Sequence, residues 1–143
     1  MTKLVNLLFV VLFSTLLFNC SKAQNNNNSS NSKTKLEVYY FHATNRCPTC
    51  NAVENNAKKL LEEKYKEQLE NKTIKFTSIN IDDDVNKALV EKYEISFSTL
   101  LIINKSGTKE IVKDFTDIAF QYARTNPEKY ANLLAEELNN NLK

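Results

Sequence analysis

The sequence of 143 residues contains one glycine, one histidine, two prolines, three cysteines and no tryptophan. A single glycine excludes the glycine-rich phosphate loop of flavin and nicotinamide enzymes, which needs several glycines at fixed spacing. We therefore expect no organic cofactor. The formal net charge is only +2, and basic residues are interleaved with acidic ones, so the composition gives no reason to expect a nucleic-acid partner. No internal repeat is present.

The N-terminus carries a long apolar run. Lys3 precedes an almost unbroken apolar stretch over residues 4–18, which is too short for a comfortable membrane span and is typical of a secretory signal peptide. The run is apolar on every face, which disfavours an uncleaved amphipathic anchor. Two processing sites compete at its end. Cys20 stands where the lipid-modified cysteine of a bacterial lipoprotein stands, whereas Ala23 completes an ordinary cleavage site before Gln24.

The chain divides into three predicted segments. Residues 1–23 are the signal peptide, and we favour lipidation of Cys20 over cleavage after Ala23. Residues 24–35 are a polar low-complexity stretch that cannot offset the entropy of ordering it, so we expect a disordered tether. Residues 36–143 form one small domain. We expect an exported monomer, anchored to the membrane in the periplasm if Cys20 is lipidated and soluble in the periplasm otherwise.

Hydrophobic spacing in the domain predicts α/β elements in the order βαβαββα. Runs of β-branched and aromatic residues indicate strands, and apolar residues at helical spacing indicate helices. The predicted strands cover residues 36–42, 73–81, 98–104 and 109–115, and the predicted helices cover residues 48–70, 82–93 and 117–143. Gly107 falls where a tight hairpin turn needs positive φ. We expect the last helix to restart at Asn126, with Pro127 as its first helical residue.

This order predicts a mixed central sheet with helices on both faces. The first two strands are joined through a helix and must be parallel, whereas the last two form an antiparallel hairpin. The acidic run Asp82, Asp83 and Asp84 lacks the spaced ligands and the glycine of a calcium loop. We interpret it as the start of the short helix, where carboxylates are stabilised.

The stretch Cys47-Pro48-Thr49-Cys50 lies between the first strand and the first helix. If the helix begins there, Cys47 lies at or beside the N-cap, and Pro48 takes the first helical position, where a missing N–H has no cost. Unpaired N–H groups at that end stabilise a thiolate, and Arg46 acts in the same direction. We predict that Cys47 is the attacking nucleophile and Cys50 the resolving thiol. Two inert core cysteines would explain the motif less well.

Two stretches carry a resemblance to thioredoxins. "FHATNRCPTC" is similar to their F-x-A-x-W-C-x-x-C, with one residue more before the first cysteine, and "YEISFSTLLIINKSGT" resembles their Y-x-I-x-x-x-P-T-L-x-x-F-x-x-G. The resemblance covers most of the chain after the tether and implies a thioredoxin-like fold. Tyr40 corresponds to the buried acid of that family, which puts the usual proton path in doubt. Ser98 before Thr99 replaces the cis-proline that shapes the substrate groove, so we expect a trans bond and an altered groove.

The first stretch also resembles a narrower group. "VYYFHATNRCPTC" is similar to small exported proteins of Bacteroidetes called nitrophenyl compound nitroreductase subunits, the ArsF family, which implies an arsenic-operon context. Nothing in the sequence reads as a flavin or nicotinamide site, so we do not predict nitroreductase activity for this chain alone. The motif also resembles the glutaredoxin spacing. The T-V-P and the glycine pair with which glutaredoxins bind glutathione are lacking, so protein thiols are the expected substrates.

Two side chains near the motif have open roles. Glu54 stands four residues after Cys50 on the same helical face and could relay its proton. Most such glutamates are solvent-facing helix residues, and this is the interpretation we favour. His42 could tune Cys47 or bind a metal, although a lone histidine is more often structural.

Three functions follow from the motif. We predict an exported thiol–disulfide oxidoreductase whose partners are cysteine-containing exported or membrane proteins. The alternative is soft-metal or metalloid binding, of copper, zinc or arsenite, by Cys47 and Cys50 together with His42. Those residues fall short of a closed zinc site, and heavy-metal-associated domains have a different element order. The third hypothesis is a redox-inert docking module, for which Cys47→Ser would leave partner binding intact.

Overall fold

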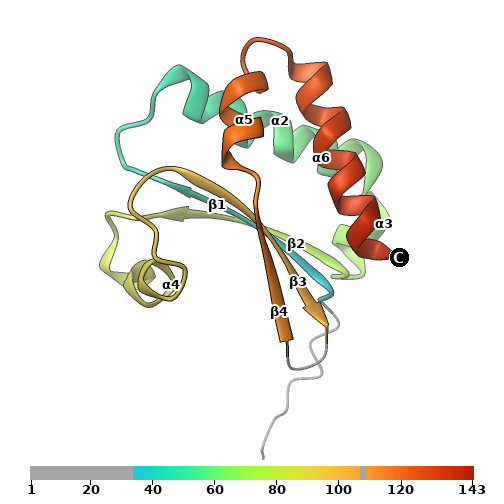
Figure 1. Cartoon of the computed structure of the whole chain (residues 1–143), viewed down its shortest axis with the longest axis horizontal. Coiled ribbons are helices and arrows are strands. Elements are labelled where there is room, and N and C mark those ends of the chain that lie inside the picture. The colour runs from blue at the N-terminus through green and yellow to red at the C-terminus, as the bar shows by residue number, and fades with distance from the viewer. Residues whose placement is uncertain (1–33, 107–108) are drawn as a thin grey trace, which may run out of the picture. The chain divides into compact units, whose positions relative to one another are not determined.

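The computed structural model describes residues 34–106 and 109–143 (Figure 1). The predicted signal peptide with Cys20, most of the tether and the turn at Gly107 lie outside these residues. The described elements are β1 (Leu36–His42), α2 (Pro48–Lys64), α3 (Lys66–Glu70), β2 (Ile74–Asn80), the 3-10 turn η1 (Asp84–Asn86), α4 (Lys87–Lys92), β3 (Thr99–Ser106), β4 (Lys109–Asp114), α5 (Thr116–Tyr122) and α6 (Pro127–Leu142). None of these helices has the length and apolar content needed to cross a bilayer.

Within the described residues the strands form one sheet, in the order β2-β1-β3-β4. β1 and β2 run parallel, with Val38 opposite Phe76, and their connection passes through α2 and α3. β3 runs antiparallel to β1 and to β4. The parallel first pair and the antiparallel last pair are those that the sequence predicts. The fold is thioredoxin-like.

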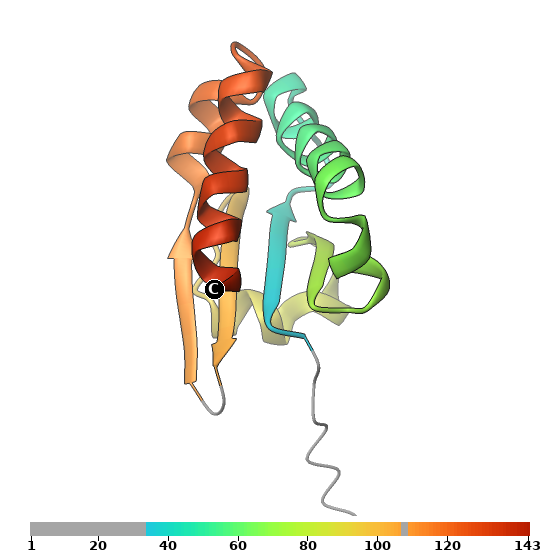
Figure 2. The ribbon, with the colours of Figure 1, turned by 90° about the vertical axis from the view of Figure 1, so that its right-hand side faces the viewer.

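Helices cover both faces of the sheet, as predicted. α2, α5 and α6 pack on one face, where α2 and α6 lie side by side (Figure 2), and α4 lies against the other (Figure 1). The central strand β1 is buried on both sides, with Val38 and Tyr40 in the larger core and Tyr39 and Phe41 in the smaller one. Burying one such side chain contributes about 2 kcal/mol. β1 is therefore a rigid support for whatever follows its C-terminal end.

The predicted helix over residues 48–70 is broken at Tyr65, which was not expected. Tyr65 has φ −127° and ψ 26°, outside the helical region, and α3 begins at the next residue. Its ring is buried, and its hydroxyl donates to the carbonyl oxygen of Ala135 in α6 at 3.0 Å. This long-range contact holds the Tyr65 side chain at the break between α2 and α3. The spacing of apolar residues within residues 48–70 carries no information about it.

The restart of the last helix is confirmed at both predicted residues. Asn126 is the N-cap of α6, and its side-chain oxygen accepts a hydrogen bond from the N–H of Lys129 at 3.0 Å. Pro127 is the first helical residue, where it loses no hydrogen bond.

Among the described residues, two helix ends use a residue with positive φ that is not glycine. Lys72 follows α3 with φ 63°, and Glu94 follows α4 with φ 53°. At Glu94 the chain makes the paired bonds of a Schellman turn, in which the N–H of Ile95 donates to the carbonyl of Val90 at 2.9 Å. A side chain with a Cβ is disfavoured in this conformation. These two positions therefore carry local strain that glycine would relieve.

Glu94→Gly is expected to raise the free energy of unfolding by up to about 1 kcal/mol, because glycine tolerates positive φ. The matched control is Glu91→Gly inside α4, which should lower the same quantity by about 1 kcal/mol, since glycine in a helix interior is destabilising. Urea unfolding of the two variants measures both effects. Destabilisation of similar size by both would contradict the strain at Glu94.

Candidate functional site

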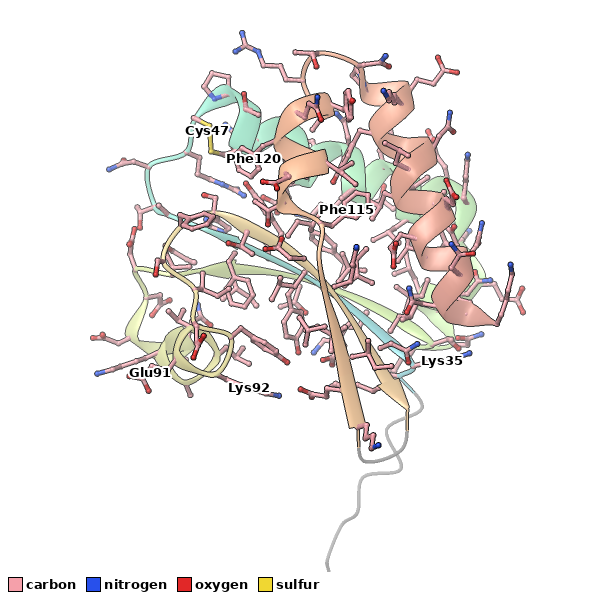
Figure 3. The ribbon with its side chains drawn as sticks, in the orientation of Figure 1. Lys35, Cys47, Glu91, Lys92, Phe115 and Phe120 are labelled. Carbon is pink, nitrogen blue, oxygen red and sulfur yellow. A yellow bond between two sulfur atoms is a disulfide. The ribbon has the colours of Figure 1, made fainter. Side chains whose placement is uncertain are left out.

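Cys47 and Cys50 form a disulfide at the start of α2, with their Cα atoms 5.0 Å apart (Figure 3). Cys47 is the N-cap of the helix, with extended φ and ψ of −73° and 161°, and Pro48 is the first helical residue. Both assignments are those made from the sequence. The Cys47–Cys50 turn thus lies at the junction between β1 and α2.

The two cysteines differ in their access to solvent. Cys47 is exposed, whereas the side chain of Cys50 has a relative exposure of 8%. The N–H of Cys50 donates to Cys47 Sγ at 3.0 Å, and Thr49 lies half-buried between them. A sulfur that receives a backbone N–H at a helix N-terminus is well placed to carry negative charge. The arrangement therefore suits Cys47 for nucleophilic attack and Cys50 for resolution.

Tyr40, in β1, holds the cysteine turn through a hydrogen bond to its backbone. Its side chain is fully buried, and its hydroxyl donates to the carbonyl oxygen of Cys50 at 2.9 Å. Burial raises the pKa of the Tyr40 hydroxyl, so this group stays a neutral hydrogen-bond donor at neutral pH. Tyr40 thus holds the backbone of Cys50 in place and provides no base.

Glu54 is buried, and the solvent-facing interpretation of this residue is wrong. Its relative exposure is 5%, and its carboxylate pairs with Lys58 at 2.6 Å and with Arg46. Burial raises the pKa of this carboxyl, but hydrogen bonds from Lys58, Arg46 and Ser78 outweigh burial and hold the pKa at about 2. A carboxylate of such low basicity is a poor acceptor for the proton of Cys50.

Arg46 was expected to stabilise the Cys47 thiolate, but its charge is paired with a carboxylate. Its guanidinium pairs with Glu54 and lies over the ring of Tyr40, 5.5 Å from the ring centre. The positive charge beside Cys47 is therefore compensated by a carboxylate. The sequence placed Arg46 next to the nucleophile correctly but gave no indication of this partner, because Arg46 lies in the loop and Glu54 in the helix.

Ser98 and Thr99 lie at the same end of the sheet, because Thr99 is paired with Phe41 at the end of β1. The described residues contain no cis peptide bond, so the bond before Ser98 is trans, as expected. Thr99 is buried, and its hydroxyl donates to the carbonyl oxygen of Phe97 at 2.9 Å. Phe97 itself is 65% exposed. Sequence reasoning missed it, since a phenylalanine just before a buried strand is normally a core residue.

His42 is half-buried, with Nδ1 3.0 Å from the carbonyl oxygen of Ala43 and its ring 5.9 Å from the ring of Tyr40. In the part of the chain that the structure describes, no three His, Cys, Asp or Glu side chains are grouped so that they could hold a metal ion. The proposed set of His42 and the two cysteines is thus not assembled here.

The acidic run leads into the 3-10 turn η1, and the α-helix predicted over residues 82–93 begins only at Lys87. Asp83 Oδ1 accepts a hydrogen bond from the N–H of Val85 at 3.1 Å and caps η1. Asp82 accepts the N–H of Thr44 at 2.7 Å, which lowers the pKa of its carboxyl. This contact ties the loop before Cys47 to the end of β2.

No protein-family model and no curated protein matches this sequence. Among solved structures, the germline-specific thioredoxin Deadhead of Drosophila melanogaster is similar at 23% identity and a TM-score of 0.49, covering 73% of this chain and 83% of its own. Mitochondrial thioredoxin 3 of Saccharomyces cerevisiae has 17% identity and a TM-score of 0.45, covering 76% and 81%. Trxlp of Edwardsiella tarda has 18% and 0.44, covering 72% and 84%.

Glu54→Gln is expected to lower the free energy of unfolding at pH 7 by about 2 kcal/mol, because it removes the charge that Arg46 and Lys58 neutralise. The folded-state pKa of about 2 lies below the ordinary value of 4.5. This stability is therefore present above pH 4.5 and is lost as the pH falls from there towards 2. The variant should lose less stability than wild type over that interval.

Urea unfolding between pH 7 and pH 2.5 measures the effect. The control is Glu63→Gln on the exposed face of α2, where a pair with Lys59 at 3.9 Å should contribute less than about 0.5 kcal/mol. Equal losses in the two variants at pH 7 would contradict the assigned role of the buried carboxylate.

Proposed function

We propose that the protein is an exported thiol–disulfide oxidoreductase that acts on protein thiols. The observation that supports this most directly is the disulfide at the N-terminus of α2, with one exposed sulfur at the N-cap and one buried sulfur a turn further on. A disulfide that only braced the fold would need no exposed sulfur at a helix N-terminus. The asymmetry suits a cycle in which one sulfur meets the substrate and the other completes the exchange.

In the reducing direction, the Cys47 thiolate attacks one sulfur of a substrate disulfide. The substrate S–S bond breaks, a mixed disulfide forms, and one substrate thiolate leaves. The Cys50 thiol then loses its proton to solvent, and its thiolate attacks Cys47 Sγ, which releases the second substrate thiolate and closes the Cys47–Cys50 disulfide. Two electrons pass to the substrate. The oxidising direction runs through the same mixed disulfide in reverse.

The surroundings of the pair favour a protein substrate. Phe97 presents an exposed aromatic side chain at the end of the sheet where the cysteine turn lies, and such side chains contribute contact area in protein recognition. Ser98 stands where the thioredoxins that the sequence resembles have a cis-proline, and the bond before it is trans. We infer that the partner is an extended segment of a cysteine-containing protein.

The cellular setting in this proposal comes from the N-terminal residues. The apolar stretch at 4–18 and Cys20 support export and attachment to the membrane by a lipid, so the partners would be cysteine-containing exported or membrane proteins. The resemblance to the ArsF family implies an arsenic-operon context and supplies no mechanism. The proposal assigns no nitroaromatic reduction to this chain.

The nucleophile is tested by trapping. Cys47→Ser is expected to abolish formation of a mixed disulfide with a peptide disulfide, because the remaining thiol is buried. Cys50→Ser should accumulate the mixed disulfide almost completely, because nothing resolves it. Mass spectrometry of the protein after incubation measures the adduct. Equal accumulation in both variants would sink the assignment, and absence of an adduct in both would sink the proposed function.

Phe97→Ser is expected to raise the KM for a protein disulfide several-fold while leaving reduction of the pair by dithiothreitol unchanged, because the exposed ring contacts only the larger substrate. Val85→Ser serves as control, since it removes an apolar side chain that is 80% exposed on η1. Steady-state turnover of a reduced or oxidised protein substrate gives the KM values. An unchanged KM for Phe97→Ser would contradict this part of the proposal.

A further inference from the structure

We propose that the ion pair between Arg46 and Glu54 sets the redox equilibrium of the cysteine pair. Both residues act as positioning residues through charge, and neither touches the reacting sulfur of a substrate. The inference rests on the proposed thiol–disulfide function and names the groups in this chain that adjust it.

The two residues bracket the motif. Arg46 directly precedes Cys47, and Glu54 follows Cys50 by one helical turn. Side chains four residues apart on a helix have Cβ atoms about 6 Å apart, so Glu54 and Cys50 are neighbours on one face of α2. The Arg46 guanidinium contacts the Glu54 carboxylate. The positive charge of the residue before Cys47 therefore lies next to the negative charge of Glu54.

The ion pair is partly shielded from water, because Glu54 is buried while the Arg46 side chain is 23% exposed. Glu54 has a relative exposure of 5%, and the Arg46 guanidinium lies over the buried ring of Tyr40. The Tyr40 hydroxyl in turn holds the carbonyl of Cys50. Charges in such surroundings act on one another more strongly than charges at the surface. Removing the charge of either Arg46 or Glu54 should therefore change the stability of the Cys47 thiolate.

One hydrogen-bond donor of Arg46 is left unpaired at this position in the described structure. Among the described residues, its Nε is buried without a hydrogen-bond partner, and an unpaired buried donor is destabilising. The ion pair with Glu54 and the contact with the Tyr40 ring are the interactions that hold the Arg46 side chain in the described structure.

The two charges should shift the equilibrium in opposite directions. The disulfide is neutral, whereas the reduced pair carries the negative charge of the Cys47 thiolate. Arg46 favours that charge and therefore the reduced form, and Glu54 disfavours it. Lys58, which pairs with Glu54 at 2.6 Å and has a side chain 47% exposed, adds a second positive charge that water screens more strongly. Because the charges of Arg46 and Glu54 oppose one another, removing both should change the equilibrium little.

The test is the equilibrium constant between the protein and glutathione, measured for the full exported chain by quantifying free thiols. Glu54→Gln is expected to shift this constant about tenfold towards the reduced pair, which corresponds to about 30 mV. Arg46→Gln is expected to shift it about tenfold towards the disulfide. The thiolate absorbance of Cys47 should titrate at lower pH in the first variant and at higher pH in the second.

Three further variants separate charge from packing. Arg46→Lys keeps the charge and should stay within about threefold of wild type, even if it unfolds more easily. Arg46→Gln/Glu54→Gln removes both charges and should also return close to wild type. Lys59→Gln removes an exposed charge from the same helix, where Lys59 pairs only with Glu63 in the described structure, and should leave the equilibrium unchanged.

The outcomes distinguish this inference from the proposed function. If the wild-type pair does not equilibrate with glutathione at all, the proposed thiol exchange fails. If wild type equilibrates but Glu54→Gln and Arg46→Gln shift the constant in the same direction, or not at all, the ion pair has only a structural role. Opposite shifts with a near-normal double variant establish the electrostatic role.

Discussion

The junction between β1 and α2 is the constraint on which the rest of the structure depends. β1 is the most deeply buried strand, because it lies inside the sheet and helices cover both of its faces. The chain leaving it must become a helix whose first N–H groups lack intrahelical partners. Cys47 takes the N-cap, where its sulfur receives the N–H of Cys50. A rigid strand and a helix terminus together hold the reactive sulfur at the surface.

Next to the cysteine turn, the charges of Arg46 and Glu54 compensate one another. This distinguishes the site from one that contains a single buried acid. Tyr40 occupies the strand position and contributes a neutral hydroxyl. The charged groups come from the loop and the helix, where Arg46 and Glu54 compensate one another. In the proposed cycle, stabilisation of the Cys47 thiolate falls mainly to the helix N-terminus and its N–H groups. Resolution by Cys50 in that cycle relies on solvent for proton removal, since the pKa of Glu54 is too low for a useful base.

Local sequence patterns were enough to predict the strands, the parallel first pair and the antiparallel last pair, the caps at Cys47 and Asn126 and the trans bond before Ser98. Each prediction uses a signal within one short stretch, except the parallel pair, which follows from the helix that joins its two strands. The burial of Glu54 was mispredicted because helical spacing shows which residues share a face of the helix. It does not show that Arg46, in the loop before the helix, pairs with Glu54. The break at Tyr65 depends on α6, which lies far away in sequence. The positive φ of Glu94 was invisible because such positions are usually recognised by a glycine.

The central claim is that the cysteine pair exchanges electrons with protein thiols. A redox titration of the purified protein, in which free thiols and bound metal are followed together after metal-free purification, tests it most directly. The account predicts one two-electron transition between Cys47 and Cys50 with a potential between about −120 and −270 mV. A pair that shows no disulfide transition in this range and instead binds a stoichiometric metal ion would contradict it.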